Sequence, residues 1–559
     1  MFRYKERSPE ETIRCVKELL NNIGIKVSET WFESKVDHVY SLRVNIIGTG
    51  YGANGKGITK ELALASAYGE LSERLGNGII FKHQERKKTY KAGFFYFPDE
   101  IMLTKDYFLN DNNNEVLSEL LKPLCMSHSN AIECWDQIMD SWISIPFQNE
   151  SNATRVFLPY QMLKVYGSNG MAAGNTKEEA FVQAVSEIFE RNCLQQIIRK
   201  RLCPPIINRE YVSREYPVIE EILTSIEKEE NLTVEVRDCS INMGFPVVGL
   251  CVYDNIKHTD SVSFGAHPVE EIALERAVTE LFQGRNTNDI SNLVTNRSCE
   301  ERFNILSILK NGIGYFPYQF HMHQYSYEVN YNQNREFYSN SEIKKSILDL
   351  CSVHKKNIYT RYIQIGAMYV THVIIPEMSE VFHYDVFQFQ CLNMQHKVKQ
   401  LFSNPDGLSP VELQACLEFL DYIRKTPEFD LNLSKDFSVL DNRIKQKRIL
   451  RLLISGFNEL QMYGRALQYL ELLKKYISQD EYMCLRCIFD LYKEKYDDTD
   501  AYQYLIKYFS NTIISNSINY LDYSNAIKSF KTNNSTSGFY HSEEWLNCVY
   551  KLKHGILVR

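Results

Sequence analysis

The chain has 559 residues, of which 44% are hydrophobic and 24% are charged, a composition typical of a folded globular protein with a large core. Its formal net charge of −7 argues against sequence-independent binding of nucleic acid, so we expect no direct nucleic-acid partner. No apolar stretch follows the start, and no run of about 18 apolar residues occurs, so we expect neither a secretory signal nor a membrane span. The 14 cysteines show no disulfide framework, which favours a cytoplasmic location.

The first predicted element is a helix near the N-terminus. Ser8 is a suitable N-cap and Glu11 completes a capping box, while Gly24 is suited to end the helix. Strand-like and helical patterns then alternate to about residue 405. The predicted strands cover 39–48, 143–148, 232–240, 245–254 and 369–376, and the predicted helices cover 59–78, 176–200 and 268–286. This order indicates a mixed α/β (α+β) core of repeated strand and helix units over 1–405.

The chain changes character after Ser409. Nearly every later segment has a helical pattern, and short polar turns separate the segments. The stretch YGRALQYLELLKKY, residues 463–476, has the small-residue spacing of antiparallel helix pairs. We therefore predict an all-α, tetratricopeptide-like C-terminal domain over 406–559.

A motif recurs three times in the predicted core. Residues 57–74 read GITKELALASAYGELSER, and residues 174–191 read GNTKEEAFVQAVSEIFER. Gly, Thr-Lys-Glu, two alanines and the final Glu-x-x-Glu-Arg keep the same order in both copies. A weaker third copy, HPVEEIALERAVTELFQGR, covers 267–285. Each copy predicts a helix with one apolar side for packing on a sheet and one polar side.

The polar side of each helix forms a stripe, because residues three and four apart share a helix face. The stripes contain Ser66, Glu70 and Glu73 in the first copy, Glu179, Gln183, Glu187 and Glu190 in the second, and Arg276, Glu280 and Gln283 in the third. Solvation alone explains any single stripe, Thr176 with Glu179 also fits a capping box, and Arg74 and Arg191 also fit salt-bridge partners. The shared register of Glu-x-x-Glu-Arg in two otherwise different copies favours a common function.

Converging glutamates require a counter-charge, and Mg²⁺ prefers oxygen ligands and often binds together with substrate phosphates. Arg74, Arg191 and Arg276 suit those phosphates, and glycine-flanked helix starts offer N–H groups to anions. The residues therefore predict a nucleotide–Mg²⁺ site. The stretch GYGANGKG, residues 50–57, resembles a P-loop but has Gly57 where Ser or Thr is required. It predicts a phosphate contact through Lys56 or a simple glycine turn.

The sequence resembles the YcaO family at NGKGITKELALASAYGELSER, SNGMAAGNTKEEAFVQAVSEIFER, SFGAHPVEEIALERAVTELFQGR and VIIPEMSEVF. The resemblance implies the ATP-binding fold of that family, with Mg²⁺ bound by Glu70, Glu73, Glu187 and Glu190. Together with the arginines and Gln183, it gives a predicted ATP-binding set of Lys5, Ser66, Arg74, Asn175, Glu179, Gln183, Arg191 and Arg276. Ala172 stands where the family has a serine, so a contact through that hydroxyl is lost.

Within the family, the sequence is most similar to stand-alone bacterial members that assist β-methylthiolation of an aspartate of ribosomal protein S12. This similarity implies a radical-SAM methylthiotransferase and ribosomal protein S12 as partners, and a homodimer. The enzymatic chemistry of the family is ATP-dependent activation of a peptide amide carbonyl, and no catalytic residue is predicted here.

Two alternatives stay open. The first is a cyclodehydratase or thioamide-forming enzyme with a peptide substrate. The sequence ends KLKHGILVR without the proline-rich tail of peptide-cyclising members, which favours the accessory factor. The second alternative is a non-catalytic nucleotide-binding scaffold.

Overall fold

The computed structural model describes residues 4–49, 51–78, 99–109, 111–124, 127, 131, 142–228, 232–284, 301–312, 314–329, 336–381, 398, 401–402, 407–425, 442–528, 551 and 556–558. The chain forms two compact units, which are described separately. The first comprises Met1–Glu133, Asp140–Asp385 and Ser537–Arg559, and the second comprises Cys134–Met139 and Val386–Thr536. The predicted boundary at 405 lies outside the described residues.

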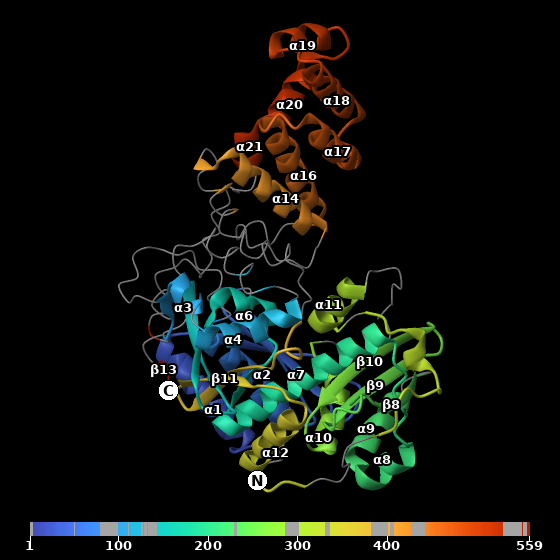
Figure 1. Ribbon diagram of the computed structural model, residues 1–559. Helices are drawn as coiled ribbons and strands as arrows, with labels where there is room; N and C mark the ends of the chain where they lie inside the picture. Colours follow the sequence, from blue (N-terminus) through green and yellow to red (C-terminus); the bar gives the residue numbers. More distant parts are fainter. Residues whose placement is uncertain are drawn as a thin grey trace. The chain divides into compact units, whose positions relative to one another are not determined.

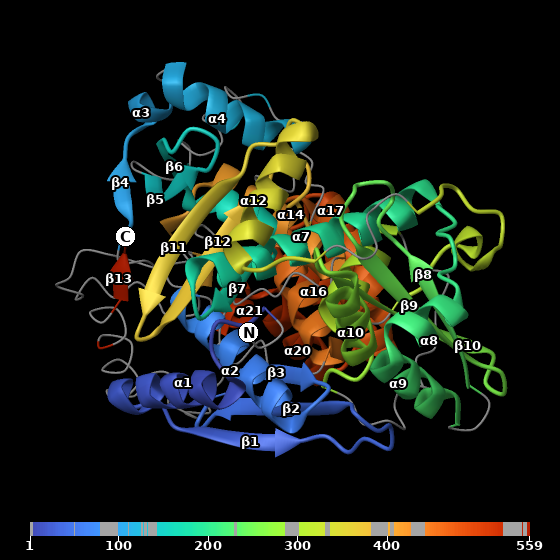
Figure 2. The same ribbon diagram turned by 90° about the horizontal axis from the view of Figure 1, so that it is seen from below.

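Figure 1 shows the helices and strands of the described residues, and Figure 2 labels the antiparallel sheet near the N-terminus of the first unit. Its strands, in spatial order, are β1 (Val27–Trp31), β2 (Tyr40–Ile46) and β3 (Gly52–Gly57). Helix α2 (Lys60–Gly76) packs on β3, and α1 (Pro9–Ile23) packs on α2. The predicted capping box of α1 is confirmed, since Ser8 and Glu11 exchange side-chain-to-backbone hydrogen bonds. The glycine-rich stretch around Lys56 forms strand β3, so it is neither a P-loop nor a turn. Its alternate glycines allow α2 to approach the strand closely.

Among the described residues, the largest sheet has seven strands. Its main path runs β4 (Ile101–Leu103), β5 (Trp142–Asn149), β11 (Tyr359–Ile365), β12 (Met368–Ile374) and β7 (Met171–Gly174). Two further strands pair beside this path, β6 (Arg155–Pro159) with β5 and β13 (Ile556–Val558) with β11. The short apolar run of β13 is therefore a strand within the stretch for which the sequence predicts only helices. Helix α7 (Lys177–Lys200) packs on β7 and β12 and contacts α12 (Asn340–Val353).

A third, antiparallel sheet contains β10 (Thr259–Ala266), β9 (Val247–Asp254) and β8 (Leu232–Asp238). Helix α10 (Glu270–Glu280) packs on β10 and β9, and α9 (Pro217–Lys228) packs on β8. Figure 2 shows the three sheets arranged around α7 and α10. The other α-helices described in this unit are α3 (Lys105–Leu109), α4 (Asp111–Leu121), α6 (Tyr160–Tyr166), α8 (Arg209–Glu215) and α11 (Glu301–Asn311).

The three sequence repeats fold as three strand–helix pairs, β3 with α2, β7 with α7 and β10 with α10. Each helix approaches its strand so closely that the glycine there has no room for a side chain. A Cβ atom added at Gly55 would lie 2.1 Å from the carbonyl oxygen of Ala63, and one at Gly265 would lie 2.2 Å from that of Ala273. One at Gly174 would lie 2.5 Å from the nitrogen of Ala180. The small residues at these strand–helix contacts therefore serve packing.

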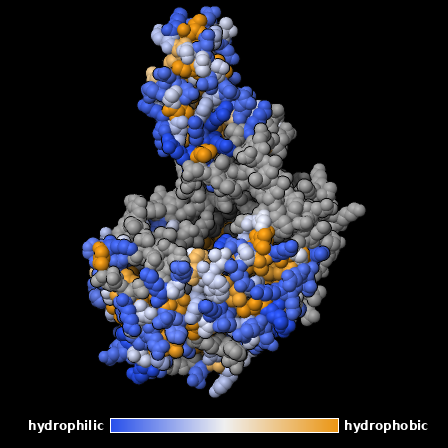
Figure 3. All heavy atoms as spheres, turned by 180° about the vertical axis from the view of Figure 1, so that it is seen from behind, coloured by the Kyte–Doolittle hydropathy of each residue, from blue (hydrophilic) through white to orange (hydrophobic). Residues whose placement is uncertain are grey.

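The second unit is helical in its described residues. It contains α14 (Pro410–Lys425), α16 (Asn442–Glu459), α17 (Tyr463–Leu473), α18 (Gln479–Lys493), α19 (Asp498–Leu505), α20 (Asn511–Leu521) and α21 (Tyr523–Lys528). Its core includes Leu417, Leu453 and Phe489, which are fully buried. Figure 3 shows small, separate apolar patches on an otherwise hydrophilic face of the described residues. None of the helices in these residues combines the length and the apolar character of a membrane span.

Candidate nucleotide and metal site

A cavity of about 1320 Å³ in the first unit is bordered by α2, α7 and α10 and by strands that precede them. All twelve residues predicted to bind ATP or Mg²⁺ lie in its wall: Lys5, Ser66, Glu70, Glu73, Arg74, Asn175, Glu179, Gln183, Glu187, Glu190, Arg191 and Arg276. The three polar stripes thus face one shared space, although long segments of sequence separate them. Their assignment to particular ligand atoms stays a prediction.

Glutamates of α2 and α7 pair with an arginine one turn along their own helix. Glu70 Oε1 lies 2.9 Å from Arg74 Nη2, and Glu187 Oε1 lies 2.6 Å from Arg191 Nη2. Glu73 Oε1 is 3.9 Å from Arg74 Nε, and its side chain is 14% exposed. The expected salt bridges therefore form. They leave both arginines in the cavity wall, where a phosphate has access to them.

The carboxylates of the two helices also affect one another. Burial is the main cause that raises the pKa of Glu73, Glu187 and Glu190, the last to about 7. Like charge adds to this effect, because Glu187 raises the pKa of Glu73 and Glu70 raises that of Glu187. Nearby arginines oppose the shift only in part. A divalent cation would relieve this repulsion, so a set of four carboxylates fits Mg²⁺.

Glu70 and Glu187 face their arginines rather than a common centre. In the described part of the chain, no three His, Cys, Asp or Glu side chains are placed as ligands of one metal ion. Glu70 and Glu187 would therefore have to rotate away from Arg74 and Arg191 to coordinate a cation. Such a rotation frees both guanidinium groups at the same time, and free guanidinium groups favour binding of an anion beside the metal.

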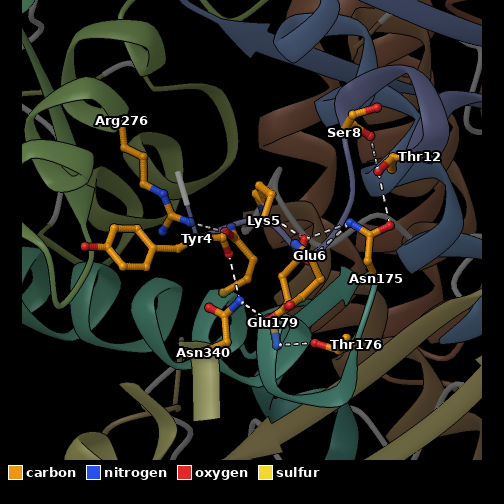
Figure 4. Close-up of polar contacts among 11 residues, drawn as sticks. Tyr4, Lys5, Glu6, Ser8, Thr12, Asn175, Thr176, Glu179, Arg276 and Asn340 are labelled. Atoms are coloured by element: carbon orange, nitrogen blue, oxygen red, sulfur yellow. Dashed lines mark hydrogen bonds and ion pairs between the residues drawn. The ribbon is translucent and has the colours of Figure 1, made fainter. Parts of the chain in front are cut away.

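Glu179 joins the start of α7 to the N-terminal segment (Figure 4). Its carboxylate, 5% exposed, accepts hydrogen bonds from Lys5 Nζ at 3.2 Å, from the backbone N–H of Glu6 at 3.0 Å, and from Asn175 Nδ2 at 3.1 and 3.2 Å. Thr176 caps the helix by accepting from the backbone N–H of Glu179. The reciprocal bond of a capping box is not formed by Glu179, whose carboxylate is directed to Lys5 and Asn175 instead.

The N-terminal segment is fixed by contacts that the sequence analysis did not predict. Asn340, 1% exposed at the start of α12, donates through Nδ2 to the carbonyl oxygen of Tyr4 at 2.7 Å and to Glu6 Oε1 at 2.8 Å. Tyr4 has a φ of 65°, a left-handed conformation that places Lys5 next to Glu179. These partners are 334 and 336 positions apart, and no local pattern connects them.

Two cations link α10 to the other walls of the cavity. Arg276 Nη1 donates to the carbonyl oxygen of Ala266 at 2.7 Å, and Nη2 donates to Gln183 of α7. Lys56 of β3 forms an ion pair with Glu280 at the end of α10. Burial lowers the pKa of Lys56 to about 8, and the positive charge of Arg276 contributes to this shift. Both charged residues of the α10 stripe, Arg276 and Glu280, therefore interact with side chains of the other cavity walls.

Comparison with known protein families identifies the family of this chain. The sequence model described as "YcaO cyclodehydratase", ATP- and Mg²⁺-binding, matches residues 54–379. The chain belongs to the YcaO family. That span includes all three strand–helix pairs apart from the first two residues of β3, and every predicted site residue except Lys5. ATP and Mg²⁺ are accordingly its cofactors.

Two curated relatives are similar over a long alignment. The ribosomal protein S12 methylthiotransferase accessory factor YcaO of Escherichia coli is 28% identical over 395 residues, which cover 68% of this chain and 66% of that protein. An uncharacterized protein of Haemophilus influenzae is also 28% identical, over 70% of this chain and 68% of its own length. The matched region therefore spans about two thirds of each relative.

Solved structures with a similar fold have lower identity. A heterocyclase in complex with substrate and cofactor is 18% identical, with a TM-score of 0.48 over 67% of this chain and 53% of its own. The YcaO protein of Methanopyrus kandleri bound with AMPPCP and Mg²⁺ is 16% identical, with a TM-score of 0.44 over 68% of this chain and 93% of its own.

Proposed function

We propose that this chain is an ATP- and Mg²⁺-dependent accessory factor for β-methylthiolation of an aspartate of ribosomal protein S12 in the cytoplasm. The observation that carries the nucleotide part is the single cavity that collects the acidic and basic stripe residues in a chain of this family. The S12 part is supported by the similarity to the E. coli accessory factor.

In this proposal, Glu70, Glu73, Glu187 and Glu190 bind Mg²⁺, which would neutralise charge on the phosphates. The chain's own residues bind and orient the nucleotide. Lys5, Arg74, Arg191 and Arg276 surround the phosphates with positive charge, while Ser66, Asn175, Glu179 and Gln183 supply polar contacts. Because Glu179 already fixes Lys5 and Asn175, these contacts are organised before the nucleotide arrives.

The partners in this proposal are the radical-SAM methylthiotransferase and ribosomal protein S12. The helical second unit, which we regard as tetratricopeptide-like, provides a surface for protein contact or for homodimer formation. Exposed aromatic side chains occur on it at Tyr496 and Tyr508, which are 51% and 65% exposed. Aromatic residues are enriched in protein interfaces, which is consistent with such a role.

Complementation tests this function. An E. coli strain without its own accessory factor would receive this chain, and mass spectrometry of ribosomal protein S12 would measure methylthiolation. We expect restored modification with the native chain, and none with a Glu70→Gln, Glu187→Gln double variant. A Glu18→Gln variant, which alters an exposed ion pair on α1, serves as the matched control. Unchanged S12 in cells that make the folded native chain would contradict the proposal.

A second candidate follows from the description of the family as a cyclodehydratase. In that case the chain removes water from a peptide backbone, or makes a thioamide, at the expense of ATP. Co-expression with a candidate precursor peptide, followed by mass measurement of that peptide, distinguishes the two functions. Loss of water from the peptide without any change in S12 supports the cyclodehydratase.

A further inference from the structure

The cavity wall includes the edge of a strand that the proposed nucleotide contacts leave unused. Strand β10 ends its sheet, and among the described residues only β9 pairs with it. Four consecutive residues of β10 line the cavity, Ser261, Val262, Ser263 and Phe264. Successive side chains of a strand point to opposite faces, so a cavity that touched one face would be lined by every second residue. Because four consecutive residues line this cavity, the edge of the strand borders it.

Both faces of this sheet are already covered. On one face, the Phe264 ring stacks on Phe316 at a centroid distance of 5.7 Å. On the other face, Ser263 Oγ donates to the carbonyl oxygen of Ala277 in α10 at 2.7 Å. The edge is therefore the part of β10 that the cavity can reach.

The pairing with β9 identifies the backbone groups that point into the cavity. The backbone N–H of His267 donates to the carbonyl oxygen of Pro246 at 3.2 Å, which makes this a hydrogen-bonded pair. Hydrogen-bonded and non-hydrogen-bonded pairs alternate along an antiparallel ladder. In the observed register, Gly265 and Ser263 are then directed toward β9. Val262 and Phe264 direct their N–H and C=O groups away from β9.

The opposite side of β9 gives an independent check. The backbone N–H of Cys239 donates to the carbonyl oxygen of Val247, so the odd-numbered residues of β9 face β8. The even-numbered residues, including Val248 and Leu250, then face β10 and pair with Gly265 and Ser263. Both ladders give the same assignment.

The edge therefore presents two N–H donors and two C=O acceptors, at Val262 and Phe264. Groups two residues apart on a strand are about 7 Å apart, which is the repeat of an extended peptide. The next outward carbonyl, that of Ala266, already accepts from Arg276. This contact puts the free edge directly beside a predicted nucleotide residue.

The size and the lining of the cavity leave room for a second ligand. Its volume of about 1320 Å³ exceeds the roughly 300–1000 Å³ usual for a site of one small molecule. Ile308 and Leu309 of α11 add an apolar wall, which suits side chains of a polypeptide. Buried backbone groups without a partner are costly, so this edge favours a ligand that supplies matching groups.

We propose that an extended segment of the polypeptide substrate pairs through its main chain with β10 at Val262 and Phe264, inside the nucleotide cavity. This proposal rests on the proposed function, in which ribosomal protein S12 is the polypeptide that is modified. Strand addition places a backbone carbonyl of that segment near the ATP phosphates, while its side chains contact α10 on one face and α11 on the other.

Hydrogen exchange resolved to single amides tests the proposal on the full chain. The probes are AMPPCP–Mg²⁺ alone, AMPPCP–Mg²⁺ with purified ribosomal protein S12, and AMPPCP–Mg²⁺ with a pool of end-capped octapeptides of mixed sequence. We expect S12 or the pool to slow exchange at Val262 and Phe264 about tenfold, as for amides that gain a hydrogen bond. The amide of Ser263, which already faces β9, is the internal control.

Each outcome bears on the proposal. Protection by AMPPCP–Mg²⁺ alone means that the edge binds the nucleotide, and this overturns the inference. No protection by either S12 or the pool also overturns it. Protection by the pool but not by S12 supports the edge and counts against S12 as the partner, so the two failures are distinguishable.

A variant pair gives a second measurement. Val262→Pro removes one outward N–H at a strand edge, where proline is tolerated. Val262→Ala shortens the same side chain and keeps the N–H. We expect the first variant to weaken binding of the peptide pool about tenfold relative to the second, with equal AMPPCP–Mg²⁺ affinity in both. Equal binding of the pool by the two variants contradicts the proposed pairing.

Discussion

Helices α7 and α10 take equivalent positions after a short strand, yet they carry opposite chemistry. Both pack so closely that a Cβ atom at Gly174 or Gly265 would lie 2.5 or 2.2 Å from the helix backbone. Helix α7 presents Glu187 to the cavity, whereas α10 presents Arg276. Two different requirements therefore act on the repeated segments. Close packing of helix on strand requires small residues in each copy, whereas the residues of the polar stripe can differ between copies.

The largest effect is expected when the shared packing is broken. Gly265→Ala and Gly174→Ala each force a methyl group against helix backbone, so each lowers the free energy of unfolding by about 3 kcal/mol. Gly69→Ala is the control, because no atom lies within 4 Å of its added Cβ, and it raises helix stability by up to about 1 kcal/mol. Urea unfolding followed by circular dichroism measures all three. Equal stability of the three variants would show that the strand–helix contact is loose.

The charge difference between the helices is tested by nucleotide binding. Glu70→Gln with Glu187→Gln weakens AMPPCP binding in the presence of Mg²⁺ by about 2 kcal/mol, or roughly thirtyfold, because metal ligands are lost. Without Mg²⁺ the same variant does not weaken binding, because it releases Arg74 and Arg191 from their salt bridges to Glu70 and Glu187. Arg276→Gln weakens binding with and without Mg²⁺, because it removes a positive charge near the phosphates. Titration calorimetry under both conditions checks this contrast, which fails if the two variants respond alike to Mg²⁺.

The pH dependence of the free energy of unfolding tests the buried glutamates of α7. The pKa of Glu190 is about 7 in the folded chain and ordinarily 4.5, so between these values the folded state keeps a proton that the unfolded state has lost. Raising the pH through this window therefore destabilises the fold without Mg²⁺, and the loss is complete above about pH 7. Glu190→Gln reduces this slope, and the raised pKa values of Glu73 and Glu187 account for what is left. Urea midpoints across the window measure the slope, and an unchanged slope in the variant contradicts the contribution of Glu190.

The smallest effect concerns the helix starts, where α7 has a cap and α10 does not. Thr176 accepts from the backbone N–H of Glu179, whereas Val269 before α10 offers no side-chain cap. Thr176→Ala lowers the free energy of unfolding by about 1 kcal/mol, and Thr59→Ala, which removes the equivalent cap of α2, has a similar effect. AMPPCP affinity stays the same in both variants. A tenfold loss of affinity in Thr176→Ala alone would link this cap to the nucleotide site.

The elements with strong local signals were predictable from sequence. The capping box at Ser8 and the β-branched run of β9 formed as expected. The strands β3 and β7 were not found, because GANGKG and MAAG consist mostly of small residues with low strand propensity, and their extended conformation depends on the helices packed on them. Tertiary packing, rather than local propensity, fixes these two strands.

The residues of the polar stripes could be predicted from the sequence, but the arrangement of their side chains in space could not. Residue spacing placed Glu187 and Arg276 on polar faces, and the structure brings those faces to one cavity. Spacing could not show that Glu179 faces Lys5 rather than its own helix start. It also could not find Asn340, because its partner Tyr4 is 336 positions away. Long-range contacts of this kind leave no periodic signal in a single sequence.

Strand β13 has a consequence for the order in which this chain matures. It completes one side of β11, yet the larger segment of the second unit, Val386–Thr536, lies between the two strands in sequence. At about 5–20 residues per second, the ribosome needs roughly 10 to 40 seconds to pass from β11 to β13. During that interval the edge at Ile363–Ile365 has no β13 to cover it, while the helices of the second unit can already form. An uncovered edge is prone to pair with other chains, so the seven-stranded sheet is most vulnerable to aggregation late in translation.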